Sequence, residues 1–343
     1  MLRVLVRLPN WLGDALMARP LLHALRASQR GASIAAVGPV ALLELLAGDR
    51  TWDESHAWPL GPGALAALRE PRADAALVLP PSFSSAWFAF RTGARVRAGF
   101  AHEGRSPLLT RALRRPARGD LHLAREYERL GETLGVTAAA SAPPSLTVRE
   151  EGRAQARDLL GAEETPYAVL APGATYGPAK RWPAERFAET GRRLAARGWR
   201  LFACGAAAER EACAEVAERC GAQSLAGRTS LAAMAAVCAG AAAVVSNDSG
   251  LAHLAAAVGA PTVAVFGSTS SAWTAPLGAR VAVAQRPPVC SPCFARTCRI
   301  GYRCLEAVSV DDVLAALASL AALEATGGAP VRAGGAAGAG IPE

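Results

Sequence analysis

The stretch RVLVRLPNWLGDALMARPLLHAL, residues 3–25, decides the fold. Residues 3–8 form a mostly apolar run of strand length, residues 9–13 include the turn formers Pro and Gly, and residues 14–27 carry leucines at helical spacing. A strand, a short turn and a helix in this order begin a β-α-β unit. The opening of the chain therefore predicts a parallel sheet covered by helices.

The same alternation continues along the chain in two series. The connection SAPP at residues 141–144 separates them, and the Gly- and Ala-rich end of the chain has too little apolar bulk to order itself. We predict an α/β protein of two Rossmann-like domains, residues 1–150 and 151–325, that face each other across a cleft, and a disordered tail at 326–343. Further strands are predicted at residues 33–37, 75–79, 167–170, 200–204, 243–246 and 262–266.

Composition excludes several classes of protein. With 343 residues, 51% hydrophobic and 19% charged, the chain has a sizeable core and is neither disordered nor a coiled coil. Its longest apolar stretch, residues 231–245, has 15 residues, fewer than the roughly 18 to 20 that cross a bilayer. The N-terminus lacks the apolar region and cleavage site of a secretion signal, so we expect a cytoplasmic protein.

The net charge of +8 favours anionic partners. The arginines are scattered and no aromatic RNA-binding signature accompanies them, so we expect no nucleic acid but an anionic substrate or lipid headgroup. Three rare residues stand out. Lys180 is the only lysine among 37 basic residues, and Asn10 and Asn247 are the only asparagines. All three lie in predicted loops that follow strands.

Asp14 follows the first predicted strand, where a carboxylate at the start of a helix would point into the cleft. It is our candidate general base. The structural alternative is a helix cap, because Asp often accepts hydrogen bonds from backbone N–H groups. This loop has no G-x-G-x-x-G sequence, the fingerprint that a dinucleotide-binding domain carries at this position, which disfavours an oxidoreductase.

The second loop, APGATYGPAKRWP at residues 171–183, combines Gly and Pro with hydroxyl and cationic groups. Backbone N–H groups, the Thr175 hydroxyl and the Lys180 ammonium would stabilise the charge on a leaving diphosphate without a metal. The alternative is a surface loop with a solvated lysine. A lone lysine in an arginine-rich chain favours function, because a planar guanidinium does not replace a compact ammonium.

The third loop, SNDSGLAH at residues 246–253, places polar groups at the start of a helix. Taken singly, Asp248 or Ser249 would be a helix cap and His253 a packing histidine. The turn at residues 267–269 adds hydroxyl and backbone donors at the same edge, or caps its own helix. Because polar residues gather at several strand ends, we predict a polar binding site on the rim of the cleft.

On these motifs the chain resembles the heptosyltransferases of glycosyltransferase family 9. The resemblance implies a GT-B fold and an inverting transfer of L-glycero-D-manno-heptose from ADP-heptose. It implies as acceptor the heptosyl-Kdo2-lipid A inner core of lipopolysaccharide at the inner membrane. It spans residues 1 to about 323 and rests on PNWLGDALM (9–17), LVLPPSFSSAW (77–87), GF (99–100), APGATYGPAKRWP (171–183), SNDSGLAHLAAAVGAPTVAVFGST (246–269) and the cysteines of 290–304.

The resemblance also implies roles for single residues. Asp14 would deprotonate the acceptor hydroxyl as it attacks the anomeric carbon, and Lys180 would assist the leaving diphosphate, with no cofactor required. Glu209 falls where the family holds the adenosine ribose, although its surroundings AAAEREA also fit a solvated helix. The donor-binding positions are filled by Thr175, Tyr176, Lys180, Glu209, Asp248, Ser249, Gly250 and His253.

Four arginines in or near GARVRAGFAHEGR are candidates for the acidic groups of the acceptor. A solvated basic face is the alternative. A lipid-linked acceptor would keep the enzyme at the cytoplasmic face of the inner membrane, held peripherally by basic charge rather than by an inserted helix. The four are Arg91, Arg95, Arg97 and Arg105.

Cys290, Cys293, Cys298 and Cys304 have the spacing C-x2-C-x4-C-x5-C, which fits a zinc site or disulfides. A reducing cytoplasm disfavours disulfides. The resemblance includes these cysteines without implying a metal. We therefore predict no metal, with structural zinc as the alternative.

Three other functions stay open. A different GT-B transferase, including a heptosyltransferase that adds another heptose of the core, would use much the same residues. A non-catalytic nucleotide-sugar-binding module would keep the cleft, but the presence of both Asp14 and Lys180 disfavours it. A nicotinamide dehydrogenase would need the glycine fingerprint that is missing.

Overall fold

The computed structural model describes residues 2–137 and 143–325, so the predicted tail at 326–343 lies outside the described residues. It contains two sheets of six parallel strands, with the orders β3-β2-β1-β4-β5-β6 and β12-β11-β10-β7-β8-β9. The first sheet comprises β1 (Arg3–Arg7), β2 (Ser33–Gly38), β3 (Glu54–Ala57), β4 (Ala75–Val78), β5 (Val96–Ala101) and β6 (Arg111–Arg114). The second comprises β7 (Tyr167–Ala171), β8 (Arg200–Ala203), β9 (Gln223–Ser224), β10 (Ala243–Asn247), β11 (Thr262–Phe266) and β12 (Val281–Gln285).

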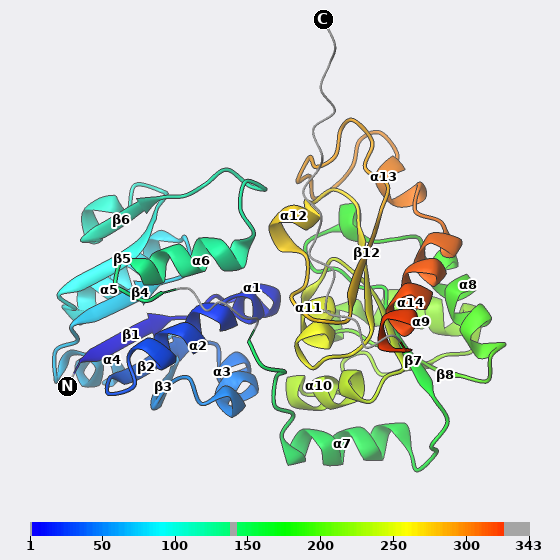
Figure 1. Ribbon diagram of the computed structural model, residues 1–343, viewed down its shortest axis with the longest axis horizontal. Helices are drawn as coiled ribbons and strands as arrows, with labels where there is room; N and C mark the ends of the chain where they lie inside the picture. The colour runs from blue at the N-terminus through cyan, green and yellow to red at the C-terminus, as the bar shows by residue number, and fades with distance from the viewer. Residues whose placement is uncertain (1, 138–142, 326–343) are drawn as a thin grey trace, which may run out of the picture.

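Helices connect the strands and cover both faces of each sheet, which confirms the predicted pair of Rossmann-like domains (Figure 1). The N-terminal helices are α1 (Leu12–Met17), α2 (Arg19–Ser28), α3 (Val40–Leu46), α4 (Ala64–Arg69), α5 (Phe83–Thr92) and α6 (Leu123–Glu132). The C-terminal helices are α7 (Glu150–Leu160), α8 (Ala184–Ala195), α9 (Arg210–Cys220), α10 (Leu231–Ala239), α11 (Gly250–Ala257), α12 (Ser271–Thr274), α13 (Arg303–Glu306) and α14 (Val310–Ala325). Short 3-10 turns are η1 (Ala47–Asp49), η2 (Ser106–Leu108), η3 (Pro178–Lys180) and η4 (Ala207–Glu209).

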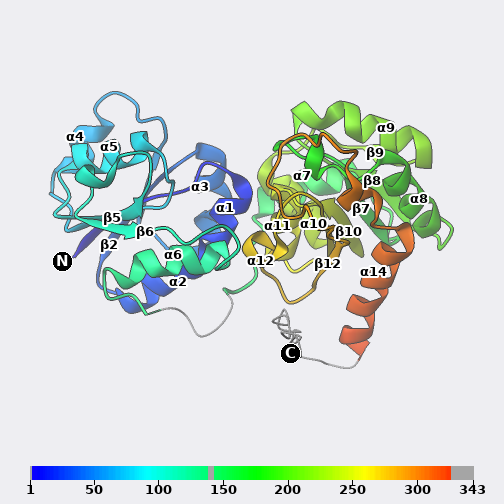
Figure 2. The same ribbon diagram turned by 90° about the horizontal axis from the view of Figure 1, so that it is seen from above.

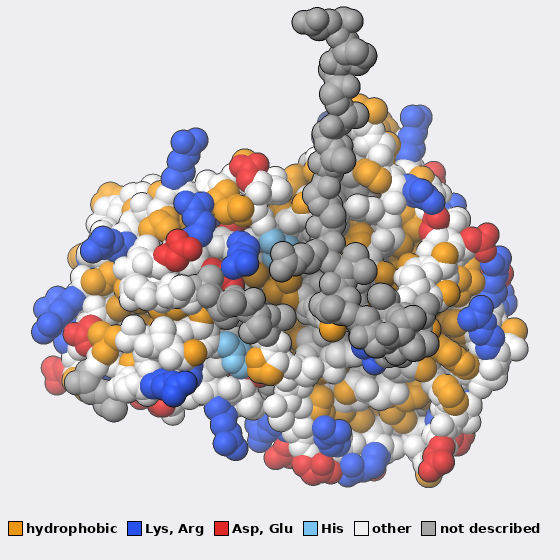
Figure 3. All heavy atoms as spheres, viewed as in Figure 1, with side chains coloured by type: hydrophobic (Ala, Val, Ile, Leu, Met, Phe, Trp, Pro, Cys, Tyr) orange, Lys and Arg blue, Asp and Glu red, His pale blue; other side chains and the backbone are white. Residues whose placement is uncertain are grey.

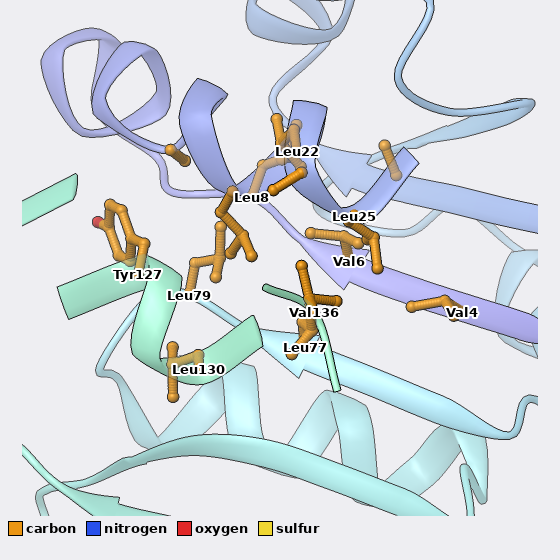
Figure 4. Close-up of a cluster of buried hydrophobic side chains, with 14 of the residues drawn as sticks. Val4, Val6, Leu8, Leu22, Leu25, Leu77, Leu79, Tyr127, Leu130 and Val136 are labelled. Atoms are coloured by element: carbon orange, nitrogen blue, oxygen red, sulfur yellow. The ribbon is translucent and has the colours of Figure 1, made fainter. Parts of the chain in front are cut away.

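Alternation along β1 divides the N-terminal core into two. Val4 and Val6 pack with side chains of α2 and α6, as Figure 4 shows, whereas Leu5 packs with side chains of α4 and α5. Successive side chains of a strand point to opposite faces, so one buried strand serves both layers. Accordingly, α2 and α6 lie on one side of the sheet and α4 and α5 on the other (Figure 2).

The single helix predicted at residues 14–27 is wrong, because two helices, α1 and α2, meet at Ala18. Pro20 lies in the first turn of α2. Proline lacks an N–H group and its ring clashes with the preceding turn, so it begins a helix but does not continue one. The break gives the short α1 a direction of its own, toward the other domain.

The domains meet where α1 packs against α11 (Figure 1). Leu16 of α1 belongs to the same buried cluster as Leu254 of α11. Two glycines allow the close approach: a Cβ on Gly13 would lie 2.8 Å from Cδ2 of His253, and a Cβ on Gly250 would lie 3.1 Å from Cβ of Leu12. Helix α1, which carries Asp14, is therefore held directly against the second domain.

Basic side chains are spread over the surface rather than gathered into a run on the face seen in Figure 3. Among the described residues, no helix combines the length and the apolar character that crossing a bilayer requires.

Candidate active site

The candidate site lies between the two sheets, because the loops that carry its residues all follow parallel strands. Asp14 follows β1, the loop with Lys180 follows β7, and Asp248 follows β10. Parallel strands bring such loops to one edge of their sheet. The packing of α1 on α11 then brings the edges of the two sheets together.

Asp14 lies in the first turn of α1, half-buried at the domain boundary. No side chain caps α1, whose N-cap position is Trp11, so the helix-cap interpretation of Asp14 is wrong. Burial raises the pKa of Asp14 from 3.8 to about 6; Arg115 and Lys180 oppose this rise, and Asp248 adds to it. A carboxylate with a pKa near 6 is suited to accept a proton at neutral pH.

Lys180 and Asp248 form an ion pair inside the C-terminal half of the site. Nζ of Lys180 lies 2.5 Å from Oδ2 of Asp248, and the Thr269 hydroxyl donates to the same oxygen at 2.6 Å. The ammonium also lies 5.0 Å from the centre of the Tyr176 ring. Asp248 is buried, so its first role is to fix Lys180 in place.

Asn247 ties the loop after β7 to the end of β10. Its side-chain carbonyl accepts from the backbone N–H of Trp182 at 2.9 Å, and its amide donates to the carbonyl of Pro172 at 2.8 Å. The side chain is fully buried. Asn247 therefore shapes the loop that carries Lys180, a positioning role that its rarity in the sequence signalled but did not define.

His253 is buried in α11, beside Gly13 of the opposite domain. Burial lowers the pKa of His253 to about 4, against the opposing influence of Asp248, so its ring is neutral at neutral pH. Ser249 occupies the N-cap position of α11 but makes no capping bond; its hydroxyl lies 3.1 Å from that of Ser246. His253 and Gly250 line the contact with α1, against Gly13 and Leu12 respectively.

The remaining donor candidates lie at the strand ends of the second sheet. Thr175 is exposed on the loop after β7. The hydroxyl of Tyr176 donates to the carbonyl of Phe294 at 2.5 Å, so it is already engaged. Glu209 accepts from the N–H of Ala206 at 2.8 Å and lies over the loop after β7, where a Cβ on Gly173 would overlap its carboxylate. Glu209 is thus at the site edge and not a solvated helix residue.

The four arginines predicted for the acceptor are not brought to Asp14. Arg105 is fully buried, and its guanidinium donates to the carbonyls of Phe100 at 2.8 Å and Pro80 at 2.6 Å, so it supports the fold. The other three lie at the end of α5 and the beginning of β5, which is the edge of the sheet opposite the strand carboxyl ends. These three are Arg91, Arg95 and Arg97.

Arg115, which the sequence analysis missed, lies on the loop after β6 and acts electrostatically on Asp14. Arg115 is paired through Nε with the buried Glu126 at 2.8 Å, and Trp273 of the second domain donates to Glu126 at 2.7 Å. The guanidinium of Arg118 lies 5.5 Å from the ring of Trp273. The run RALRRPARG at 111–119 was the available signal.

The four C-terminal cysteines do not assemble a metal site. Within the described part of the chain, no group of three or more His, Cys, Asp or Glu side chains is placed to hold a metal ion, so the zinc alternative lacks support. Cys290 and Cys293 are exposed, Cys298 is half-buried and Cys304 is buried. The segment instead supports the donor loop, because the carbonyl of Arg296 accepts from the N–H of Ala179 at 3.1 Å.

A carboxylate on one domain and a half-buried ammonium on the other, at the carboxyl ends of two parallel sheets, fit the active site of a two-domain GT-B transferase. Comparison with known proteins gives the family. The sequence pattern of glycosyltransferase family 9 (heptosyltransferase) matches residues 64–303. The chain belongs to this family and is a glycosyltransferase.

Individual relatives agree with the assignment. Lipopolysaccharide heptosyltransferase 2 of Salmonella typhimurium is 34% identical over 304 residues, covering 82% of this chain and 87% of the relative. Lipopolysaccharide heptosyltransferase 1 of Pseudomonas aeruginosa is 32% identical over 236 residues, covering 67% of this chain and 64% of the relative. The structure of E. coli ADP-heptose lipopolysaccharide heptosyltransferase II matches with a TM-score of 0.80 at 29% identity, covering 94% of this chain and all of that one.

Proposed function

We propose that the protein transfers L-glycero-D-manno-heptose from ADP-heptose to the heptosyl-Kdo2-lipid A inner core, with inversion at the anomeric carbon. The similarity to lipopolysaccharide heptosyltransferase 2 over most of both chains supports this donor and acceptor. One observation carries the mechanism: Asp14, with a pKa of about 6, interacts electrostatically with Lys180 of the opposite domain. In this proposal Asp14 of the first domain is the base, and Lys180 of the second domain is the cation that meets the leaving group.

In the transfer, a hydroxyl of the acceptor heptose attacks the anomeric carbon of the donor, and its proton passes to the Asp14 carboxylate. The bond between the anomeric carbon and the diphosphate oxygen breaks, and ADP leaves with the electron pair. Lys180 stabilises the charge that grows on this oxygen. One displacement without a covalent intermediate inverts the anomeric configuration.

The donor half of the site requires no cofactor or metal in this proposal. The ammonium of Lys180, fixed by Asp248, supplies the positive charge, and backbone N–H groups of the loop after β7 supplement it. Glu209 would hold the adenosine ribose, because it lies at the edge of the second sheet beside that loop. Thr175, exposed on the same loop, would meet the diphosphate.

The acceptor is anchored in a membrane, so we place the enzyme at the cytoplasmic face of the inner membrane as a peripheral protein. Arg115 and Arg118 replace the arginines predicted from the sequence as cations for the carboxylate and phosphate groups of the acceptor. Both lie on the loop after β6, from which Arg115 acts electrostatically on Asp14. The net charge of +8 favours both the acceptor and an anionic lipid surface.

The decisive test incubates the purified protein with ADP-heptose and heptosyl-Kdo2-lipid A, without added metal, and follows ADP release and acceptor mass. We expect the mass of one heptose to be added by the wild type and not by Asp14→Asn. Tight binding of ADP-heptose without transfer to any core acceptor would contradict the proposal.

A second candidate is addition of the first heptose, because a heptosyltransferase 1 is also similar to this chain. The same assay with Kdo2-lipid A that lacks heptose separates the two. Transfer to this acceptor at a higher kcat/KM than to the heptosylated one would favour the second candidate.

A further inference from the structure

Helix α5 presents three large aromatic side chains to solvent. Phe83, Trp87 and Phe90 are 49%, 44% and 45% exposed, although the opposite side of the helix, including Ala86 and Ala89, is buried against the sheet. The spacing of four and three residues places the three rings in one stripe. The rings of Trp87 and Phe90 are stacked, with centroids 5.6 Å apart.

Positive charge surrounds the C-terminal end of this stripe. Residues 75–102 contain three arginines and no carboxylate. Arg91 is exposed in the last turn of α5, and the guanidinium of Arg97 lies 5.6 Å from the centre of the Phe90 ring. Arg95 is exposed and has one acidic neighbour, Asp74, at 3.7 Å. The surface made by Phe83, Trp87, Phe90, Arg91, Arg95 and Arg97 is called the α5 surface below.

The α5 surface combines aromatic rings with unbalanced arginine charge, which is the chemistry of a membrane interface. Aromatic rings settle at the level of the lipid headgroups, while arginines pair with anionic phosphates. A contiguous exposed apolar patch commonly marks a site of protein or membrane contact. The positive charge of the arginines favours a bilayer with anionic lipid as the partner, because such a bilayer offers both an apolar boundary and many phosphates.

The position of α5 fits such a partner. The helix follows β4 directly, so Phe83 lies at the carboxyl edge of the sheet, where the active site is, and Arg91 lies toward the opposite edge. Helices α4 and α5 form an outer layer of the N-terminal domain, away from α2 and α6 (Figure 2). A bilayer on this layer would lie beside the start of α5, at the same edge of the sheet as the loop that carries Asp14.

We infer that the α5 surface docks the enzyme on bilayers that contain anionic phospholipid. Phe83, Trp87 and Phe90 enter the headgroup region, and the exposed Arg91 and Arg95 bind lipid phosphates. Arg97, whose guanidinium donates to the carbonyls of Leu108 and Ala94, adds positive charge beside them. This use of the three arginines rests on the proposed function in one respect: a lipid-linked acceptor makes docking useful. The contact itself does not depend on the sugar that is transferred.

The test measures co-sedimentation of the full-length protein with phosphatidylcholine vesicles, with and without phosphatidylglycerol. Wild type binds the anionic vesicles and not the neutral ones, and added salt weakens binding. The double variant Trp87→Ser/Phe90→Ser reduces binding by about tenfold or more, because two rings no longer enter the interface. Arg91→Glu reduces it several-fold.

Matched controls separate docking from general loss of charge or apolar surface. Val40→Ser removes a side chain that is 51% exposed on α3, and Arg153→Glu reverses an exposed arginine on α7; both bind vesicles like wild type. The double variant keeps its heptose transfer to detergent-dispersed acceptor but loses transfer to acceptor in vesicles.

Unchanged vesicle binding by the double variant overturns the inference, and so does equal binding of wild type to neutral vesicles. Concentration-dependent dimers that vanish in the double variant, without vesicle binding, would instead assign the surface to a second copy of the chain. If the wild-type protein binds vesicles through α5 but transfers no heptose, the proposed function is wrong and the docking surface still stands.

Discussion

Nζ of Lys180 lies 2.5 Å from Oδ2 of Asp248, and this pair joins the loop after β7 to the loop after β10. The cation proposed to meet the diphosphate is thus part of the internal structure of the C-terminal domain, and not a mobile side chain on a loop. If Lys180 binds the diphosphate as proposed, donor binding and the stability of this domain are coupled through one ammonium group.

Lys180→Met should lower both stability and donor affinity. The substitution leaves the buried Asp248 carboxylate with the Thr269 hydroxyl and no cation, and breaking such a pair costs about 3 to 5 kcal/mol. Urea unfolding measures the loss, and calorimetry with ADP measures affinity. Lys180→Met/Asp248→Asn should recover most of the stability without recovering ADP binding. Recovery of ADP binding by the double variant would show that Lys180 has only a structural role.

The transfer rate should depend on the ionisation of Asp14. Its pKa of about 6 means that kcat/KM rises with pH through about 6 and then levels, because only the carboxylate accepts the acceptor proton. His253, with a pKa of about 4, should add no inflection between pH 5 and 8. The residual activity of Asp14→Asn, expected to be lower by about 10²-fold or more, should lack the inflection. A wild-type profile flat from pH 5 to 8 would exclude Asp14 as the base.

Asp14→Asn should stabilise the protein at high pH. The pKa of Asp14 in the folded protein lies above its ordinary value of 3.8, so the folded state holds the proton more tightly and stability falls as pH rises from about 4 to about 6. The loss is at most about 3 kcal/mol, and asparagine avoids it. Urea unfolding should show Asp14→Asn to be more stable than wild type at pH 8, with the difference shrinking toward pH 4. A variant less stable than wild type at pH 8 would contradict the burial of this carboxylate.

Asn247→Ala should disturb the donor loop from a distance. The backbone N–H of Trp182 and the carbonyl of Pro172 lose their partner, at a cost of about 1 to 3 kcal/mol for each unsatisfied buried group. KM for ADP-heptose should rise more than kcat falls, because Asn247 positions the loop and does not touch the reacting atoms. Asn10→Ala, at the only other asparagine, removes one bond from Arg7 at an exposed site and should cost less stability. Equal losses in the two variants would refute the positioning role.

Gly13→Ala should separate α1 from α11. The new Cβ would lie 2.8 Å from Cδ2 of His253, so the helix that carries Asp14 must shift. We expect a loss of kcat of about tenfold or more, since small displacements of catalytic groups have such effects. Gly31→Ala adds a methyl group where no atom lies within 4 Å and serves as the control. Full activity of Gly13→Ala would mean that the domain contact does not position the base.

Much of the fold could be predicted because buried parallel strands are apolar on both faces. Residues 75–79 are entirely apolar, and residues 3–8 and 262–266 are mostly so; β4, β1 and β11 occupy these three runs. The edge strand β3 could not be found, since its sequence ESHA is polar and half-exposed. Such a strand forms because β2 offers it hydrogen bonds, and this depends on long-range contacts.

Part of the candidate site could likewise be predicted from the sequence, and part could not. The loops with Asp14, Lys180 and Asp248 could be predicted, because the rarest polar residues of the chain, its one lysine and two asparagines, lie in or beside these loops after strands. The role of Arg105 could not, because its partners are backbone carbonyls such as that of Pro80, 25 residues away. The contact of Trp273 with Glu126 spans 147 residues and both domains, and no local pattern encodes it.

The glycine contacts between α1 and α11 also constrain recombination within the family. Gly13 of α1 packs against His253, and Gly250 of α11 packs against Leu12. The helix of each domain therefore fits only against a small residue on the helix of the other. Chimeras that join the first half of one relative to the second half of another should work only when both parents have small residues at these two positions. An exchange of N-terminal halves between relatives would therefore have to move α1 and α11 as one unit.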